Sequence, residues 1–438
     1  MKSNASRRDF IKTATLAIGF PTIIPASALG KNGTVAPSNR INVGMIGCGN
    51  RSSAAGAYHS YEKSQIVAVC DPVLNRRKGK AQKYKCDHYN DYRELLARSD
   101  VDAIHCATAD HWHVPISLAA ARAGKDMYTE KPLGISIEQD LAARQITRKH
   151  GRIFQYGTQN RSMAQVRMGL ELVLNGHIGD LKEIFVWCPP SASGGSATPV
   201  LPVPEGFDYN LWQGPAPERP FSADRCLNRG HRNGIFHIYD YAIGFIAGWG
   251  AHPLDQLQWW ADNAGMGIPV SYAGTGTIPT EGLFNVITNW DVECTYANGI
   301  KMRFMDHVTM QKKGVNPEGQ FKHGSMFVGS EGYVNVSRGA WQVFPDEMRQ
   351  HVKDVGGIKL EESRNHQHNF IDAICEKRQP IANLESAVQS DIISHLSDIA
   401  IRTGDTIRWD PKLETIVDNP VAAKMMSRPM RAPWSLEA

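Results

Sequence analysis

The sequence has 438 residues, of which 48 are Lys or Arg and 44 are Asp or Glu, and its formal net charge is +4. With 42% hydrophobic and 21% charged residues its composition is globular, which excludes a disordered, collagen-like or coiled-coil chain, and its length predicts two or three domains. The small net charge excludes an extended nucleic-acid surface, and eight cysteines without a C-x-x-C pair argue against a zinc or iron–sulfur framework.

Residues 1–28 have the pattern of an export signal. Arg7 and Arg8 precede an apolar stretch over 14–24, and the small residues at 26–28 form a cleavage site. The adjacent arginines predict the twin-arginine type, and therefore a periplasmic or otherwise exported protein. The apolar stretch is too short to span a bilayer, so we expect no stable membrane insertion.

A nucleotide-binding turn follows the signal. The apolar run 41–46 predicts a buried parallel strand, and the glycine turn after it fits G-x-G-x-x-G in its first two positions. Gly47 permits the tight turn, Gly49 lets the backbone approach a pyrophosphate, and Ser52 stands where a third glycine would allow close packing. A glycine turn in an unrelated α/β protein is the alternative interpretation.

An acidic residue ends the second strand. The apolar run 66–70 leads into Asp71, 24 residues after Gly47, where a carboxylate is expected to meet a ribose 2′-hydroxyl. A negative charge there favours NAD, because it would repel a 2′-phosphate. Arg76 and Arg77 follow closely and leave NADP open.

Two further strands are predicted at 103–107 and 127–129, with a helix over 115–123 between them. Alternating strands and helices predict a doubly wound parallel sheet, whose ligand crevice lies at the carboxyl ends of the strands. Asp110, His113, Glu130 and Lys131 all fall at such ends. Packing residues or a surface turn would be the alternative interpretation of these positions.

The second half of the sequence predicts an open, mainly antiparallel sheet with helices. An Asn-Gly turn at 298–299 between two alternating runs predicts a hairpin. A Pro/Gly/Ser-rich segment over 188–220 is predicted to be a long functional loop. The remaining predicted elements are helices over 164–175, 366–375 and 384–402 and strands over 181–187, 291–296, 300–305, 325–329 and 332–336.

Together these motifs resemble the glucose–fructose oxidoreductase/inositol dehydrogenase family (Gfo/Idh/MocA). The residues that carry the resemblance are Gly47 to Arg51, Asp71, Thr108 to His113, Glu130-Lys131-Pro132, Gln155 to Arg161 and Gly250-Ala251-His252. The resemblance covers nearly the whole chain from about Asn39. It implies a Rossmann NAD-binding domain over 39–158 and an α+β domain over 159–438 for substrate binding and oligomerisation, in a homodimer or homotetramer.

The resemblance also implies the site residues. Lys131 would hydrogen-bond the substrate oxygen and stabilise a developing alkoxide, and His252 would accept or donate the proton. The implied cofactor-binding residues are Gly47, Gly49, Asn50, Arg51, Asp71, Thr108, Asp110, His113, Glu130, Lys131 and Gln159. The suggested substrate residues are Arg161, His237, Asp240, Tyr241 and Trp249.

One position departs from the family pattern. The family histidine closes an Asp-x-x-x-His motif, but the Asp position here is Gly248. Asp240, Tyr241 and Asp255 are the candidates to replace that carboxylate. Without an HExxH or His-x-His set in the second half, except His366-Gln367-His368, we expect no metal.

These features predict an NAD(P)-dependent oxidoreductase that acts on a hydroxyl of a sugar, polyol or glycoside. An exported enzyme lacks a nucleotide pool, so the cofactor is expected to be tightly bound and recycled in the site. Two alternatives stay open. One is a redox-neutral NAD-dependent glycoside hydrolase that works by oxidation, elimination, hydration and reduction. The other is an inactive, dinucleotide-bound sugar sensor.

Overall fold

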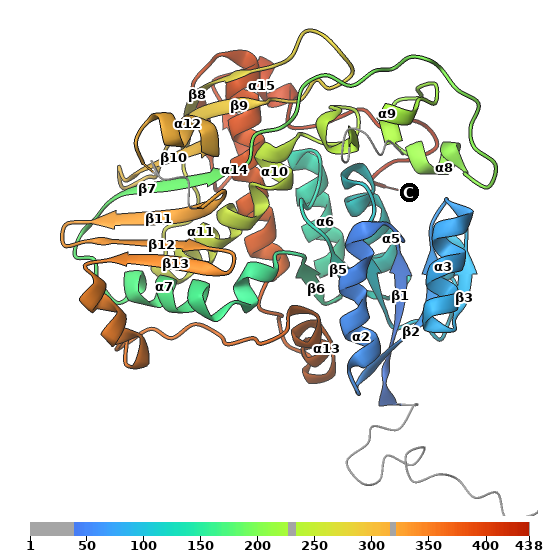
Figure 1. Ribbon diagram of the computed structural model, residues 1–438, viewed down its shortest axis with the longest axis horizontal. Coiled ribbons are helices and arrows are strands. Elements are labelled where there is room, and N and C mark those ends of the chain that lie inside the picture. The colour runs from blue at the N-terminus through green and yellow to red at the C-terminus, as the bar shows by residue number, and fades with distance from the viewer. Residues whose placement is uncertain (1–38, 227–233, 316–320, 438) are drawn as a thin grey trace, which may run out of the picture. The chain divides into compact units, whose positions relative to one another are not determined.

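The computed structural model describes residues 39–226, 234–315 and 321–437 (Figure 1). The chain from Ile41 onward forms one compact unit that contains two β-sheets. The predicted export signal at 1–28 lies outside the described residues. Within the described ranges, no helix combines the length and the apolar composition needed to cross a membrane.

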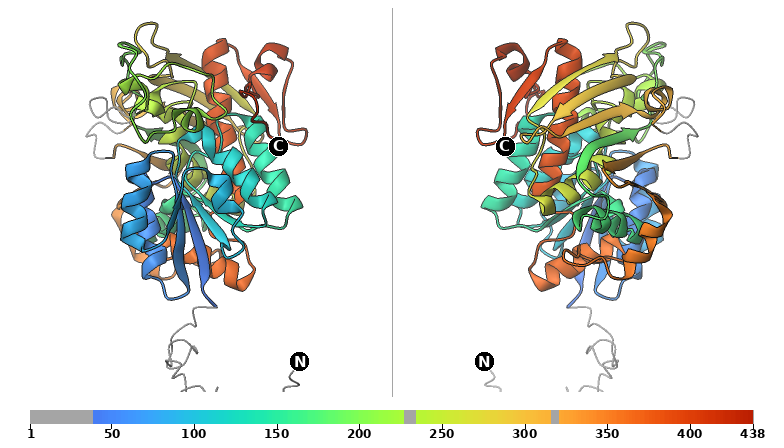
Figure 2. Two further views of the ribbon diagram at one scale, coloured as in Figure 1. Left: turned by 90° about the vertical axis from the view of Figure 1, so that its right-hand side faces the viewer. Right: turned by 90° about the vertical axis from the view of Figure 1, so that its left-hand side faces the viewer.

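The first sheet is parallel throughout, with its strands in the order β3-β2-β1-β4-β5-β6. Figure 2 shows helices on both sides of these strands, which confirms the predicted doubly wound sheet. The strands are β1 (Ile41–Ile46), β2 (Ser64–Cys70), β3 (Asp87–Tyr89), β4 (Ala103–Cys106), β5 (Asp126–Thr129) and β6 (Phe154–Tyr156). The helices are η3 (Asn50–Ala55), α2 (Gly56–Ser60), α3 (Leu74–Tyr84), α4 (Tyr92–Leu96), η4 (Asp110–Trp112), α5 (His113–Arg122) and α6 (Ile137–Lys149).

This strand order determines where a ligand can bind. Because the chain proceeds from β1 to β2 and β3 on one side and from β4 to β6 on the other, the order reverses between β1 and β4. A crevice forms at the carboxyl ends of the strands at such a reversal. Gly47 follows β1 and Thr108 lies just beyond β4, so the glycine turn lies at the reversal point.

The second sheet is mixed but mainly antiparallel, in the order β13-β12-β11-β7-β10-β9-β8-β14-β15. Strands β7 and β10 pair in parallel, and the predicted hairpin at 298–299 joins the antiparallel pair β9 and β10. This confirms the predicted open sheet of the second half. The strands are β7 (Leu181–Cys188), β8 (Ser271–Thr277), β9 (Asn289–Thr295), β10 (Lys301–Asp306), β11 (Gly324–Gly329), β12 (Tyr333–Ser337), β13 (Ala340–Phe344), β14 (Ile407–Asp410) and β15 (Thr415–Val417).

Helices α7, α11 and α14 pack against this sheet, and α14 also packs against α6 of the nucleotide-binding half (Figure 1). The hydrophobic core is therefore continuous between the two halves. The predicted boundary between residues 158 and 159 stays a prediction. The helices of this part are η5 (Gln159–Ser162), α7 (Ala164–Leu174), α8 (Tyr209–Gln213), α9 (Ala223–Cys226), η6 (Gly234–His237), α10 (Phe245–Gly248), α11 (Ala251–Ala264), α12 (His307–Lys312), η7 (Asp346–Lys353), α13 (His366–Glu376), α14 (Leu384–Thr403) and α15 (Pro420–Lys424).

The segment predicted as a long loop over 188–220 is irregular for most of its length, but α8 lies within it. The prediction missed this helix because glycines and prolines dominate the composition of the segment. The side chain of Asp208 accepts a hydrogen bond from the Leu211 N–H at 2.9 Å and caps the first turn of the helix.

Candidate active site

A cavity of about 980 Å³ opens at the carboxyl edge of the parallel sheet. Residues from both halves of the molecule line it. Of the predicted site residues, the lining includes Gly47, Gly49, Asn50, Arg51, Asp71, Thr108, Asp110, His113, Glu130, Lys131, Trp249 and His252. These side chains come from segments spread over more than 200 residues of sequence, so the fold assembles the site.

The glycine turn has the geometry that a dinucleotide needs. Gly47 has a φ of +93°, and a Cβ atom there would lie 2.4 Å from the carbonyl oxygen of Ala107. Only glycine therefore fits this position. At Gly49, nothing lies within 4 Å of the place where a Cβ atom would stand, so its backbone faces open space in the cavity.

Asp71 is buried, and backbone donors hold its carboxylate at the edge of the cavity. One oxygen accepts from the Cys48 N–H at 2.7 Å, and the other accepts from the Val73 N–H at 2.8 Å. Burial raises the pKa of Asp71, and these two donors oppose the shift. The remaining lone pairs can accept hydrogen bonds from a ribose.

Glu130 connects the glycine turn to the end of β5. Its Oε1 pairs with Arg51 Nε at 2.9 Å and accepts from Gln159 Nε2 at 3.2 Å. Gln159 also donates to the hydroxyl of Tyr128 at 2.6 Å, so it positions Glu130 from outside the cavity lining. The Oε2 atom of Glu130 is buried without a hydrogen-bond partner among the described residues. A bound polar ligand would satisfy this acceptor.

The loop that carries Lys131 is anchored from behind. The peptide bond from Lys131 to Pro132 is cis, and the Asp391 carboxylate accepts from the Leu133 N–H at 2.5 Å. The ammonium of Lys131 donates a hydrogen bond to the carbonyl oxygen of Gly248 on α10. This bond holds Lys131 at the border between the two halves of the cavity.

The charge of Lys131 depends on nearby carboxylates. Burial lowers the pKa of the Lys131 ammonium, and the carboxylates of Asp110 and Glu130 oppose the shift. Burial also raises the pKa of Asp110 to about 7. Asp110 therefore changes its charge near neutral pH, and that charge acts directly on Lys131.

His252 lies at the start of α11, next to an arginine that the sequence analysis did not single out. Arg338 Nη2 lies 2.9 Å from Nε2 of His252, and Arg338 Nε donates to Asn160 Oδ1 at 3.2 Å. Burial lowers the pKa of His252 well below its usual value, and the charges of Arg338 and Lys131 add to the shift. His252 is therefore neutral at physiological pH and can accept a proton.

The sequence contains only a weak local signal for Arg338, its position in a tight turn next to a glycine. Arg338 precedes Gly339 in the two-residue turn between β12 and β13, and Gly339 has a φ of +78°. A charged residue in a tight hairpin is ordinary at a surface. The sequence could not show that this hairpin reaches the cavity.

The carboxylate missing at Gly248 is not replaced by any of the three predicted candidates. Asp240 Oδ2 pairs with Arg219 at 2.8 Å, and Asp255 pairs with Arg161 at 2.7 Å. Tyr241 is fully buried and is not part of the cavity lining. The backbone carbonyl of Gly248 itself accepts from Lys131 instead.

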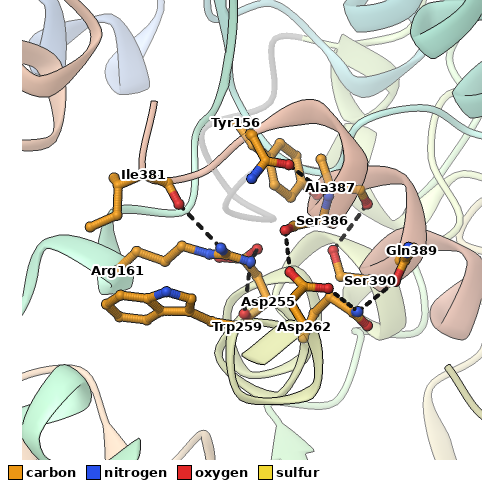
Figure 3. Close-up of polar contacts among 12 residues, drawn as sticks. Tyr156, Arg161, Asp255, Trp259, Asp262, Ile381, Ser386, Ala387, Gln389 and Ser390 are labelled. Atoms are coloured by element: carbon orange, nitrogen blue, oxygen red, sulfur yellow. Dashed lines mark hydrogen bonds and ion pairs between the residues drawn. The ribbon is translucent and has the colours of Figure 1, made fainter. Parts of the chain in front are cut away.

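The remaining predicted substrate residues lie away from the cavity lining. Arg161 forms a buried ion pair with Asp255, donates to the carbonyl of Ile381 at 3.1 Å and lies over the ring of Trp259 (Figure 3). This network joins η5, α11 and the segment before α14, so Arg161 stabilises the packing of these elements instead of binding a substrate. His237 is not part of the lining, but its ring packs 4.8 Å from that of Phe245, which is, so it lies directly behind the cavity wall.

A segment from the second half covers the nucleotide side of the cavity. Within this covering segment (residues 203–216), Phe207 forms a β-bridge with Val73, two residues after Asp71. The Leu74 N–H donates to the Gly206 carbonyl at 2.8 Å, and Asn90 Nδ2 donates to the Asp208 carboxylate at 2.8 Å.

The C-terminal residues hold the covering segment from its other side. Arg431 Nε donates to the Gly214 carbonyl, and Arg431 Nη2 donates to the Asn210 carbonyl, both at 2.9 Å. Trp112 Nε1 donates to the Trp212 carbonyl at 2.9 Å. Leu211 and Trp212 of this segment line the cavity.

These features fit a dinucleotide. The turn at Gly47 and Gly49 leaves open backbone, Asp71 presents a fixed acceptor, and Glu130 retains an unpaired buried oxygen. Each of these groups lies on the lining of one cavity.

A family described as "Oxidoreductase family, NAD-binding Rossmann fold" matches residues 41–158. Its companion, "Oxidoreductase family, C-terminal alpha/beta domain", matches residues 169–436. The chain belongs to the Gfo/Idh/MocA oxidoreductase family. The resemblance drawn from the sequence is thereby confirmed, as is an NAD-binding Rossmann half.

Curated relatives match over a shorter stretch. An alpha-N-acetylgalactosaminidase of Shewanella oneidensis is 27% identical over 210 residues, which cover 41% of this chain and 44% of the relative. A glycosyl hydrolase family 109 protein of Shewanella sp. strain MR-4 is 28% identical over the same length and coverage. The match therefore spans less than half of the length of these relatives.

Solved structures share the fold over most of the chain. The WlbA dehydrogenase of Bordetella pertussis, solved with NADH and UDP-GlcNAcA, has a TM-score of 0.62 and 17% identity, and the match covers 85% of this chain and 98% of that one. An aldose–aldose oxidoreductase of Caulobacter crescentus, complexed with glycerol, has a TM-score of 0.59 and 16% identity, with 84% and 99% covered.

Proposed function

We propose that this protein is an NAD(P)-dependent oxidoreductase that acts on a hydroxyl of a sugar, polyol or glycoside and keeps its cofactor between turnovers. The observation that carries the proposal is that Lys131 and neutral His252 line the same cavity as the glycine turn. Bound NAD supplies the hydride acceptor and donor. The solved neighbours that contain NADH with a sugar nucleotide, or that act between aldoses, support a carbohydrate substrate.

The side chains divide the work on the substrate. Lys131 donates a hydrogen bond to the reacting oxygen and stabilises the negative charge that develops on it. Removing one such donor from an enzyme typically lowers the rate by about 10²- to 10³-fold. Neutral His252 accepts the hydroxyl proton at Nε2, its unprotonated ring nitrogen, after the substrate hydroxyl replaces Arg338 Nη2 as the partner of that atom. The Gly248 carbonyl holds the ammonium in place before the substrate arrives.

The covering segment supports the proposal that the cofactor is retained. The bridge between Phe207 and Val73 and the clamp from Arg431 must both open before a nucleotide can leave past Asp71. Several hydrogen bonds would break together, so we expect the nucleotide to exchange more slowly than the substrate. A retained cofactor returns to its starting state only if the net reaction is redox-neutral or couples two substrates.

The test is to purify the protein without added nucleotide, denature it and measure the NAD(H) released. We expect close to one cofactor per chain and a spectral change of the bound cofactor when sugars are added. Protein that folds but releases no nucleotide, and binds none when it is supplied, would contradict the proposal.

Glycoside hydrolysis is the second candidate, and the relatives named as glycosyl hydrolase family 109 favour it. Both reactions use the same Lys131 and His252. Aryl glycosides separate them: release of the aglycone without net NADH supports hydrolysis, whereas a ketosugar or lactone supports the oxidoreductase.

We also propose that the protein is exported by the twin-arginine route and assembles as a homo-oligomer. The Arg7-Arg8 pair and the cleavage site support the export. Replacing both arginines by lysine should leave the unprocessed protein in the cytoplasm, and unchanged export would contradict the proposal. Native mass spectrometry of the mature protein gives the number of subunits and of bound cofactors in one measurement.

A further inference from the structure

The charged groups that line the cavity are not evenly paired. Arg51 forms an ion pair with Glu130, and Arg76 and Lys131 interact electrostatically with Asp71 and Asp110. Arg338 forms no ion pair with a carboxylate among the described residues, and the acid that acts on it, Glu130, is already paired with Arg51. The cations of the lining are Arg51, Arg76, Lys131 and Arg338, and the acids are Asp71, Asp110 and Glu130.

The bonds of Arg338 leave much of its guanidinium available. A guanidinium has five N–H donors. The bonds to Asn160 Oδ1 and His252 Nε2 use one on Nε and one on Nη2. Neither partner carries a negative charge, and the ring of Trp249 lies 5.9 Å from the guanidinium carbon. Both hydrogens of Nη1 and one of Nη2 remain, and these form the end of the fork that binds a planar carboxylate through two parallel bonds.

We propose that Arg338 binds a carboxylate on the substrate, so that the cavity takes an acidic sugar such as a uronic acid or a uronoside. This rests on the proposed function, since it names the substrate class of the same site. Because Arg338 contacts His252 directly, the carboxylate and the reacting hydroxyl belong to one sugar unit or to two adjacent ones. A neutral sugar would leave the charge of Arg338 half-buried without a counter-ion of its own.

The contact between Arg338 and His252 connects recognition to proton transfer. The charge of Arg338 helps to lower the pKa of His252. A carboxylate on Arg338 offsets that charge, so His252 holds a proton more readily once the acidic substrate is bound. The carboxylate therefore improves both KM and kcat, whereas a handle that only binds would change KM alone.

The experiment compares matched pairs of sugars that differ only in the carboxylate: glucuronic acid with glucose, galacturonic acid with galactose, and the methyl glycosides of each. The spectrum of the bound cofactor reports oxidation, and titration calorimetry with glucuronate reports binding independently. For the wild-type protein we expect a preference of about 10- to 100-fold for the carboxylated member, the range for a charge-assisted pair.

Three variants make the assignment specific. Arg338→Gln should abolish the preference, and Arg338→Lys should retain part of it. Arg349→Gln is the matched control, because Arg349 also lies over a tryptophan, Trp341, but outside the cavity lining. It should behave as wild type, and thermal unfolding checks that each variant is folded.

The outcomes of the two proposals can be told apart. Equal use of neutral and acidic sugars, or a preference that survives in Arg338→Gln, overturns the acidic-sugar assignment and leaves the oxidoreductase intact. If no sugar changes the cofactor spectrum, the proposed function fails. Calorimetry then decides the assignment of Arg338: glucuronate binding that is lost in Arg338→Gln supports it, and its absence in the wild type refutes it.

Discussion

The two halves of the cavity are built in different ways. On the nucleotide side, the groups follow successive strands of one parallel sheet, and backbone atoms hold them: Gly47 by its own φ, Asp71 by two N–H donors. On the other side, where we propose that the sugar binds and which we call the sugar side, Lys131 meets Gly248 across 117 positions of sequence, and His252 meets Arg338 across 86. The first half is a local consequence of strand and turn, whereas the second exists only after the two sheets pack together.

The two halves of the cavity also differ in the sign of the charges that line them. The nucleotide side presents a fixed acid at Asp71, and an acid at such a position favours a ribose hydroxyl over a phosphate. The sugar side gathers Lys131 and Arg338 around a neutral histidine. Substitutions on the first side should therefore change cofactor binding, and those on the second should change chemistry and substrate choice.

The largest expected effect is on the sugar side, from Lys131→Met. We expect the rate to fall by about 10³-fold, because the developing alkoxide loses its charged donor. The content of bound NAD(H) should stay close to that of wild type. Stopped-flow absorbance of the cofactor measures the first quantity, and mass spectrometry under native conditions measures the second.

The same variant tests the comparison itself. Normal turnover by Lys131→Met would mean that Lys131 takes no part in the chemistry. If neither the wild type nor this variant turns over a sugar and both bind it equally, the protein would be better described as a sensor. If cofactor is lost along with activity, the two halves are not independent.

The next largest effect is expected on the nucleotide side, from Gly47→Ala. The added Cβ would meet the Ala107 carbonyl at 2.4 Å and force a positive φ on a side-chain-bearing residue. We expect a loss of at least about 2 kcal/mol in the free energy of unfolding, measured by denaturant titration.

Gly49→Ala is the matched control for that change. Gly49 has a φ of −72°, and nothing lies within 4 Å of its added Cβ. This variant should unfold like wild type but bind NAD more weakly, because the methyl group occupies the space that the pyrophosphate needs. Equal stability of the two alanine variants would contradict the role given to Gly47.

The contrast between the halves also explains what the sequence could predict. The parallel sheet and the placement of Gly47, Asp71 and Lys131 after strands follow from short, contiguous patterns, and the structure has them there. Arg338 was missed, and Arg161 was proposed as a substrate residue but lies in a buried ion pair with Asp255. Both depend on which distant segments meet, which no local pattern encodes.

The covering segment shows the same limit. Its glycines and prolines predict a loop, and its length suggests a function. Nothing in those residues predicts that Phe207 bridges to Val73, two residues after the acidic residue that follows β2. A residue's neighbours along the chain determine its conformation more than they determine its partners.

A smaller effect is expected from Asp71→Asn, which removes the charge and leaves one acceptor oxygen for the two backbone donors, Cys48 N–H and Val73 N–H. NAD should bind about 10-fold more weakly and NADP more tightly, because the 2′-phosphate no longer meets a like charge. Fluorescence titration of both nucleotides with the reconstituted protein gives the two affinities. Adding Arg76→Gln should remove the gain for NADP, since Arg76, on α3, is the cation whose charge acts most strongly on this carboxylate. An unchanged ratio of the two affinities would show that Asp71 does not select the cofactor.

The smallest effect is expected from Asp110→Asn, and it concerns pH. Burial raises the pKa of Asp110 to about 7, so its carboxylate is charged mainly above that pH. The charge opposes the burial that lowers the pKa of Lys131, so it keeps the ammonium protonated as the pH rises. Without it, the pKa of Lys131 falls further, and the alkaline limb of the kcat/KM profile should move to lower pH. Well below pH 7 the Asp110 carboxyl is neutral in the wild type, and there the two profiles should converge. Asp126→Asn, the same change in a carboxylate outside the cavity lining, should leave the limb in place. A limb that does not move in Asp110→Asn would mean that Lys131 keeps its proton without Asp110, and that Glu130 and the Gly248 carbonyl are enough to hold the charged form at the border of the two halves.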